Sequence, residues 1–202
     1  MIKNIIFDFG DIFINLNKQG TYKAMAALGV TEITQEMMGI YHQYEKGLMT
    51  TDEFIGFFYN KFGIPKTDLV SAWNAVLLDF PQRRLNFLTE LAESKKYRLF
   101  LLSNTNDLHI KWVQDSVGEE FYNKFKNAFE QFYLSHEINF RKPDVEIYEF
   151  VLSENDLIAE ETLFVDDLKE NTDSANTLGI HTWNLIPKKD DVTELFSKNK
   201  LN

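Results

Sequence analysis

The sequence predicts an α/β fold, a doubly wound and mostly parallel sheet with a small helical bundle inserted after the first strand. In the second half of the chain, short apolar runs alternate with helical patterns, which is typical of strand–helix–strand units. Residues 16–85 instead carry helical patterns only. We therefore expect a core domain formed by residues 1–15 and 86–202, and a helical domain formed by residues 16–85.

Five apolar runs are candidates for the strands of the sheet. Continuous apolar runs predict strands that are buried on both faces, as in parallel sheets. The runs are IIF (5–7), RLFLLS (98–103), FEQFYLS (129–135), TLFVDD (162–167) and HTWNLI (181–186). Helical patterns at 142–156 and 169–180 separate the last three runs, and Gly179 is expected near the C-terminal end of the second helix.

The inserted segment contains four helical patterns, at residues 18–29, 34–47, 51–63 and 67–80. Thr50 and Glu53 fit a capping box at the start of the third pattern. Four phenylalanines then recur at helical spacing, and we interpret them as the core of a small bundle rather than as a ligand site. They are Phe54, Phe57, Phe58 and Phe62. A helix within 81–97 returns the chain to the sheet.

The composition excludes several classes of function. The 21 basic and 31 acidic residues leave a net charge of −10, which repels nucleic acid and anionic membranes. The absence of cysteine excludes disulfides, thiolate metal sites and cysteine nucleophiles. The sequence contains neither an apolar stretch of membrane-spanning length nor a signal-peptide pattern. We expect a cytoplasmic protein with no nucleic-acid or membrane partner, either a monomer or a weak homo-oligomer.

Polar side chains follow four of the predicted strands. Ligands of open α/β sheets bind at the carboxyl ends of the strands, so these side chains are expected to converge. They are Asp8 after the first run, Ser103 and Asn104 at the end of the second, Arg141 and Lys142 after the run at 129–135, and Asp166 and Asp167 at the end of the run at 162–167.

Three carboxylates at one edge of a sheet repel one another unless a cation joins them. Mg²⁺ prefers oxygen ligands and takes one or two carboxylates, waters and substrate phosphate. Asp8 and Asp167 are therefore candidates for direct ligands, and Asp166 is a candidate for a ligand through water. The sequence thus predicts a magnesium site at this edge.

The remaining side chains suit a phosphate group. Lys142 adds the positive charge that attracts phosphate and keeps a carboxylate ionised. Ser103 and Asn104 can donate hydrogen bonds to phosphate oxygens. An ionised Asp8 beside a metal-bound phosphate is a candidate nucleophile that would form an aspartyl-phosphate.

Each motif also has a purely structural interpretation. Asp8 alone fits a turn at a strand end, and Ser103 with Asn104 fits a helix cap. Lys142 and Pro143 fit a solvated turn, and the acid pair fits the start of a helix. All four interpretations holding together, in this order, is the less economical explanation.

Four stretches resemble the motifs of the haloacid dehalogenase-like hydrolase superfamily, in the family's order and over the whole chain. They are FDFGDIF (7–13), LLSN (101–104), RKP (141–143) and LFVDDLKENTDSANTLGI (163–180). YEKGLMTTDEF (44–54) and AWNAVLLDFP (72–81) resemble cap sequences of its sugar-phosphatase and epoxide-hydrolase-type phosphatase branches. The resemblance implies a Rossmann-like hydrolase core with a helical cap.

The resemblance also implies a role for each matching residue. Asp8 would be the nucleophile, and Lys142 would orient the phosphoryl group held by Ser103 and Asn104. Mg²⁺ would be bound by Asp8, Asp167 and the backbone carbonyl of Gly10, with Asp166 supporting its waters and Asn171 a weaker candidate behind them.

The sequence departs from the family pattern at Gly10, where most phosphatases of the family have an aspartate that protonates the leaving alcohol. General acid–base catalysis is worth about 10²–10⁴-fold, so its loss should lower turnover. Asp11 is one candidate substitute, but we favour its interpretation as a turn residue.

The leading hypothesis is a Mg²⁺-dependent phosphatase acting on a small phosphorylated metabolite, for example a sugar phosphate, through an aspartyl-phosphate. One alternative is a metal-independent 2-haloacid dehalogenase, which also uses an aspartate nucleophile and also lacks the second aspartate. A second alternative is a catalytically weakened binding protein of the same fold, as Gly10 would suggest.

Overall fold

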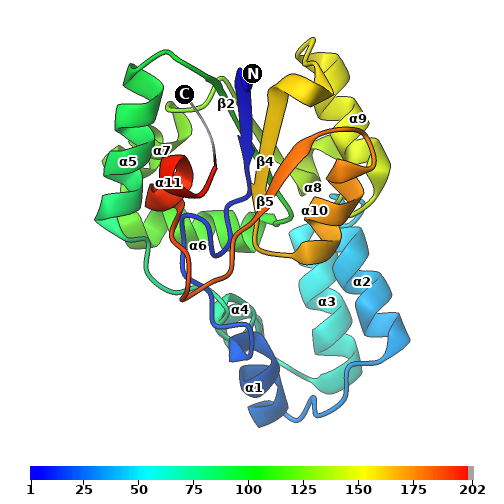
Figure 1. Ribbon diagram of the computed structural model, residues 1–202. Coiled ribbons are helices and arrows are strands. Elements are labelled where there is room, and N and C mark those ends of the chain that lie inside the picture. The colour runs from blue at the N-terminus through cyan, green and yellow to red at the C-terminus, as the bar shows by residue number, and fades with distance from the viewer. Residues whose placement is uncertain (200–202) are drawn as a thin grey trace.

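The computed structural model describes residues 1–199, and its centre is a five-stranded parallel sheet with strand order β3-β2-β1-β4-β5 (Figure 1). The strands are β1 (Asn4–Phe7), β2 (Arg98–Ser103), β3 (Gln131–Leu134), β4 (Thr162–Asp166) and β5 (His181–Asn184). Each coincides with one of the five predicted runs, and the predicted α/β class is confirmed. Since β1 is central, with β2 on one side and β4 on the other, the residue after β1 lies at the middle of the sheet edge.

Helices cover both faces of the sheet, as a doubly wound fold requires. One face packs against α5 (Gln82–Glu93), α6 (Asp107–Val117), α7 (Glu119–Lys126) and α11 (Leu195–Lys198), and the other against α9 (Val145–Glu154) and α10 (Lys169–Asn176). Alternation along β1 explains this division, because Ile5 and Phe7 join the first apolar cluster while Ile6 joins the second. The short helix α8 (Ser135–Ile138) and the 3₁₀ turns η1 (Ala159–Glu161) and η2 (Val192–Glu194) complete the core.

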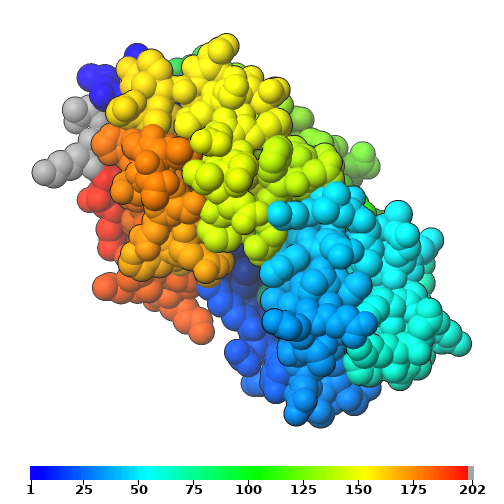
Figure 2. Space-filling model, turned by 90° about the vertical axis from the view of Figure 1, so that its right-hand side faces the viewer, coloured from blue at the N-terminus to red at the C-terminus, as the bar shows by residue number. Residues whose placement is uncertain are grey.

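Four helices lie below the carboxyl ends of the strands in Figure 1, and we call them the cap. They are α1 (Gly20–Ala27), α2 (Gln35–Glu45), α3 (Thr51–Phe62) and α4 (Lys66–Asn74). They share an apolar cluster of their own, which includes Met25, Phe54 and Trp73. Figure 2 shows them as a lobe against the rest of the molecule. The division of the chain into domains at residues 16 and 85 stays a prediction.

The third helix of the cap begins with the expected capping box. Thr50 accepts a hydrogen bond from the Glu53 amide at 3.3 Å, and the Glu53 carboxylate accepts one from the Thr50 amide at 2.8 Å. Phe54 and Phe58 are buried, as expected for a bundle core. Phe62 is 37% exposed, so its assignment to the core is wrong. It lies in the last turn of α3, where its ring stacks on Phe58 of the same helix.

Within residues 1–199, none of the helices has both the length and the apolar content that a bilayer crossing needs.

Candidate active site

The sheet register brings the predicted acids together. Phe7 of β1 pairs with Val165 of β4, so the residues that follow them, Asp8 and Asp166, lie side by side. The Asp8 amide donates to the Val165 carbonyl at 2.9 Å, which continues the pairing by one residue. Carboxylate oxygens of Asp8, Asp166 and Asp167 lie within 4.8 Å of one another, and we call these three residues the rim acids.

Lys142 lies beneath the rim acids and is 1% exposed, so the interpretation as a solvated turn is wrong. Its Nζ donates to Asp8 Oδ1 at 2.8 Å, to Asp166 Oδ2 at 2.7 Å and to the Leu102 carbonyl at 2.8 Å. These three bonds use all three protons of the ammonium group. Burial opposes its charge, but Asp166 and Asp8 outweigh burial and raise the pKa of Lys142.

Asp8 is a destabilised carboxylate in this arrangement. Burial raises the pKa of Asp8 to about 7, with Lys142 opposing the rise and Asp166 and Asp167 adding repulsion. Its Oδ1 is bonded to Lys142, whereas its Oδ2 forms no hydrogen bond with any of residues 1–199. Asp8 therefore presents one free oxygen, and additional positive charge nearby would lower its pKa and favour its ionised form.

Asp166 is fully buried and serves as a structural hub. Its Oδ1 accepts from the Leu168 amide at 2.8 Å, and Asn171 Nδ2 donates to both of its oxygens at 3.1 Å. The Oδ1 atom of Asn171 is buried and has no hydrogen-bond partner in the described part of the chain. Asn171 is also one of the residues that line the cavity between core and cap.

Asp167 forms its ion pair with a residue that sequence reasoning missed. Lys18 precedes α1, and its Nζ lies 2.5 Å from Asp167 Oδ2 and 3.4 Å from Asp11 Oδ2. Half of the Lys18 side chain is exposed. No local pattern marks this lysine, because its position opposite Asp167 depends on how the chain turns between β1 and the cap.

Ser103 and Asn104 have different surroundings. Ser103 is 2% exposed, and its hydroxyl forms no hydrogen bond within residues 1–199. The Asn104 side chain exchanges two bonds with the Lys142 backbone, donating to the carbonyl at 2.8 Å and accepting from the amide at 2.9 Å. Neither caps α6, since that role belongs to Asn106, which accepts from the His109 amide at 3.1 Å. Asn104 therefore holds the Lys142 segment in place.

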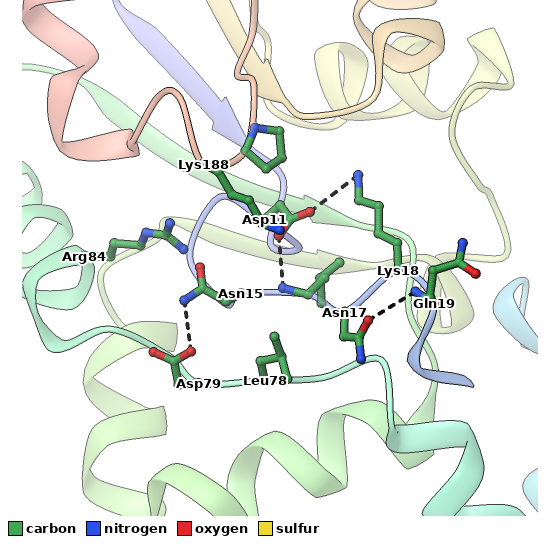
Figure 3. A pocket seen from close by; sticks show the side chains of 11 residues that line it. Asp11, Asn15, Asn17, Lys18, Gln19, Leu78, Asp79, Arg84 and Lys188 are labelled. Carbon is green, nitrogen blue, oxygen red and sulfur yellow. Dashed lines mark hydrogen bonds and ion pairs between the residues drawn. The ribbon is translucent and has the colours of Figure 1, made fainter. Parts of the chain in front are cut away.

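The turn after β1 contains the position of the missing acid. A Cβ atom at Gly10 would lie 2.8 Å from Leu16 Cδ1, so the end of the Leu16 side chain would have to move aside for a side chain there. Asp11 has a positive φ of 54°, and its Oδ1 accepts from the Leu16 amide at 3.0 Å (Figure 3). As expected, Asp11 is a turn residue. It pairs with Lys18 and lines a cleft of about 720 Å³, whose lining also includes Asn15 and Asp79, joined by a hydrogen bond (Figure 3).

A cavity of about 250 Å³ adjoins the rim acids, between core and cap. Asp8, Lys142 and Asp167 line it from the core, and Arg141 lines it from the same loop as Lys142. The cap contributes Tyr41 and Glu45, which the sequence did not single out as site residues. Their helical spacing is the only signal in the sequence, and it does not distinguish a cavity face from a packed face.

The oxygen-rich rim suits a hard divalent cation. Three carboxylates and a buried, unpartnered amide oxygen at Asn171 are the donor types that Mg²⁺ prefers. No softer donor competes, since the chain has no cysteine and the metal-type cluster found in residues 1–199 consists of aspartates alone.

Comparisons with known proteins agree with this geometry. Residues 5–185 match the family model described as haloacid dehalogenase-like hydrolase. The chain is 30% identical over 190 residues to the D-ribitol-5-phosphate phosphatase of Bacteroides thetaiotaomicron, covering 91% of each protein. It is 26% identical over 188 residues to a sesquiterpene phosphatase of Aspergillus oryzae, covering 88% of this chain and 87% of that protein.

Among solved structures, a haloacid dehalogenase family enzyme from Bacteroides thetaiotaomicron is similar over 97% of this chain and all of its own, at 35% identity and a TM-score of 0.85. That enzyme was crystallised in complex with magnesium and inorganic phosphate.

Proposed function

We propose that this chain, which belongs to the haloacid dehalogenase-like hydrolase family, is a Mg²⁺-dependent phosphatase that hydrolyses a small phosphorylated metabolite through an aspartyl-phosphate. The observation that carries the proposal is Asp8, whose Oδ2 is free while Oδ1 is held by Lys142. Phosphatase activity in the relative from Bacteroides thetaiotaomicron, over 91% of both chains, supports the reaction class.

Mg²⁺ would be held by Asp8, Asp167 and the backbone carbonyl of Gly10, with Asp166 and Asn171 contacting its waters. When bound, the ion would neutralise charge on the phosphoryl oxygens and make the phosphorus more electrophilic. It also offsets the repulsion among the rim acids that raises the pKa of Asp8. Lys18 must leave Asp167 for the ion to bind there, since Nζ now lies 2.5 Å from that carboxylate.

In the first step, Asp8 Oδ2 forms a bond to phosphorus, and the bond between phosphorus and the leaving oxygen breaks. The electron pair stays on the leaving oxygen, which takes a proton from water. In the second step, water attacks the phosphorus of the aspartyl-phosphate, which releases inorganic phosphate and restores the Asp8 carboxylate. The free hydroxyl of Ser103 holds a phosphoryl oxygen during both steps, and the positive charge of Lys142, whose protons stay bonded to Asp8, Asp166 and the Leu102 carbonyl, offsets the negative charge there.

The size of the cavity supports a small substrate. Its volume of about 250 Å³ is below the range of about 300–1,000 Å³ that drug-sized ligands occupy. Its lining includes charged and hydroxyl-bearing side chains from both core and cap. A sugar phosphate or polyol phosphate fits this lining better than a phosphorylated long apolar chain does.

The test is phosphate release from a panel of sugar, polyol and organic-acid phosphates, with Mg²⁺ and with excess chelator. We expect release that requires Mg²⁺ and falls by about a thousandfold or more in Asp8→Asn. Asp115→Asn is the matched control, because Asp115 is an exposed residue of α6 that pairs with Lys111.

Undiminished release by Asp8→Asn would refute the proposal. Halide release from a 2-haloacid in excess chelator would favour the dehalogenase alternative. Magnesium binding with no hydrolysis of any ester would favour a binding protein that has lost turnover, as Gly10 first suggested.

A further inference from the structure

Two cap residues face the nucleophile across the cavity. Tyr41 and Glu45 are one helical turn apart on α2, so both side chains lie on the same face of the helix. The Tyr41 hydroxyl donates to Glu45 Oε1, and Arg141 Nε and Nη2 each lie 3.3 Å from Glu45 Oε2. Arg141 directly precedes Lys142, so this cluster adjoins the group that would hold the phosphate.

The docking of α2 holds this cluster in position. Lys46 pairs with Asp144 at 2.7 Å, and the Lys46 carbonyl accepts from Asn139 at 2.7 Å. Gly47 has a φ of +65° and approaches the His136 carbonyl so closely that a Cβ atom there would lie 1.9 Å from it. These contacts fix the position of the end of α2 against the core. Glu45 is 4% exposed in this position. A buried carboxylate is costly unless its oxygens are paired.

The cluster keeps hydrogen-bonding capacity for a ligand. A carboxylate accepts about four hydrogen bonds, and Glu45 receives two, one from the Tyr41 hydroxyl and one from Arg141 Nε. The Arg141 guanidinium has five donors, of which two face Glu45. The contacts of Arg141 to Glu45 at 3.3 Å are long for charge-assisted hydrogen bonds, so a substrate hydroxyl could replace one of them. Neighbouring hydroxyl groups on a substrate would both donate to Glu45 and accept from Arg141.

The charges of the cluster cancel. Glu45 and Arg141 form one negative and one positive group, so the pair suits a ligand without net charge. A second anionic group on the leaving side would be repelled by the Glu45 carboxylate, because Arg141 is already paired with Glu45.

We propose that Tyr41, Glu45 and Arg141 bind the leaving group and select one that is uncharged and carries neighbouring hydroxyls close to the phosphate, an inference that rests on the proposed phosphatase function.

A nearby apolar cleft bears on the choice between a hydroxylated and an apolar leaving group. It has a volume of about 280 Å³, lies within the cap, and is lined by Met25, Met37 and Trp73 among others. Tyr41 lines both the cleft and the cavity above the rim acids. A long apolar leaving group that extended from the cavity into the cleft would pass along Tyr41.

The experiment compares two substrates in wild type, Tyr41→Phe and Glu45→Gln. Ribitol 5-phosphate carries neighbouring hydroxyls on the leaving side, and p-nitrophenyl phosphate carries none. We expect each variant to lose about 10- to 100-fold more kcat/KM with ribitol 5-phosphate than with p-nitrophenyl phosphate, as for lost hydrogen bonds to charged groups. Glu36→Gln is the matched control, because Glu36 is an exposed glutamate of the same helix that pairs with Lys61.

Glu45→Gln also allows a test that structural damage cannot mimic. The variant frees Arg141, so KM for 3-phosphoglycerate, whose leaving side bears a carboxylate, should fall while KM for ribitol 5-phosphate rises. Farnesyl phosphate tests the apolar cleft, and wild type should hydrolyse it more slowly than ribitol 5-phosphate.

Equal losses with ribitol 5-phosphate and p-nitrophenyl phosphate would overturn the inference, since they would mean that the cluster only seats the cap. Preference of wild type for farnesyl phosphate would also overturn it. Both results leave the phosphatase function intact, whereas wild type that releases phosphate from none of these esters refutes the proposed function itself. Isothermal titration of inorganic phosphate with Mg²⁺ verifies that each variant keeps a folded phosphate site.

Discussion

The two sides of the cavity are built differently. On the core side, Lys142 joins Asp8 and Asp166 through bonds of 2.7–2.8 Å in a fully buried network. On the cap side, Arg141 reaches Glu45 at 3.3 Å, and Lys18 is half exposed. Adjacent strands impose the first arrangement, whereas the second depends on how a separate group of helices docks. The comparison suggests that the chemistry is fixed by the sheet and that substrate choice can vary with the cap.

The largest predicted effect concerns how much the buried ion pairs on the core side contribute to the free energy of unfolding. Lys142→Met leaves Asp8 and Asp166 buried without their cation, so metal-free protein at pH 8 should lose about 3–5 kcal/mol of unfolding free energy. Urea denaturation measures it. Lys18→Met is the matched control, since Lys18 also pairs with a rim acid but is half exposed and should change stability by less than about 1 kcal/mol. Similar losses in the two variants would contradict the distinction between the two sides.

The second prediction concerns a histidine where core and cap meet. His109 of α6 stacks on Trp73 of the cap, with ring centroids 5.9 Å apart. Burial lowers the pKa of His109 to about 4, with a hydrogen bond to the Trp73 carbonyl opposing the fall and the charge of His136 adding to it.

At His109, the folded state therefore binds fewer protons than the unfolded state between pH 4 and 6.5. The stability associated with His109 is present above about pH 6.5 and is lost as the pH falls toward 4. We expect the change in unfolding free energy between pH 7.5 and 5, measured by urea denaturation, to differ between wild type and His109→Gln by an amount on the order of 2 kcal/mol, with the wild type losing more stability, or gaining less, at pH 5. His181→Gln, at an exposed position, is the control. An unchanged pH dependence in His109→Gln would show that this contact does not link the two sides.

The third prediction concerns Gly10, the position of the missing acid. A Cβ atom there would lie 2.8 Å from Leu16 Cδ1, so Gly10→Asp has to displace the end of the Leu16 side chain. The double variant Gly10→Asp/Leu16→Ala should exceed it by about tenfold in kcat, within the range of general acid catalysis. Phosphate release at saturating substrate is the measurement, and Leu16→Ala alone is the control. A double variant no faster than Gly10→Asp would mean that Leu16 is not the obstacle.

The smallest predicted effect concerns Lys18, which competes with a cation for Asp167. Lys18→Met should bind Mg²⁺ up to about fivefold more tightly at low salt, because an exposed ion pair is worth about 0–1 kcal/mol. Isothermal titration measures the affinity, and the difference should shrink as ionic strength rises. Weaker binding in the variant would assign Lys18 a supporting role at the metal site instead.

Several contacts could not be predicted from the sequence. LLSN was interpreted as a phosphate-binding motif, yet both polar atoms of Asn104 bind the Lys142 backbone, 38 residues away. Tyr41 and Glu45 follow an ordinary helical pattern, and only the docking of α2 turns them toward Asp8. Lys18 likewise shows no pattern. Each case depends on contacts between segments that lie far apart in the sequence, which no local pattern of residues predicts.

The sequence by itself determined the parallel sheet, the helical insertion and the convergence of Asp8, Lys142, Asp166 and Asp167. The reason is local: apolar runs specify buried strands, and residues that follow parallel strands share one edge. Only the tertiary structure decided which side chains are free and which are occupied, because that depends on packing between distant segments. The close approach of Gly47, just after α2, to the His136 carbonyl is of this second kind.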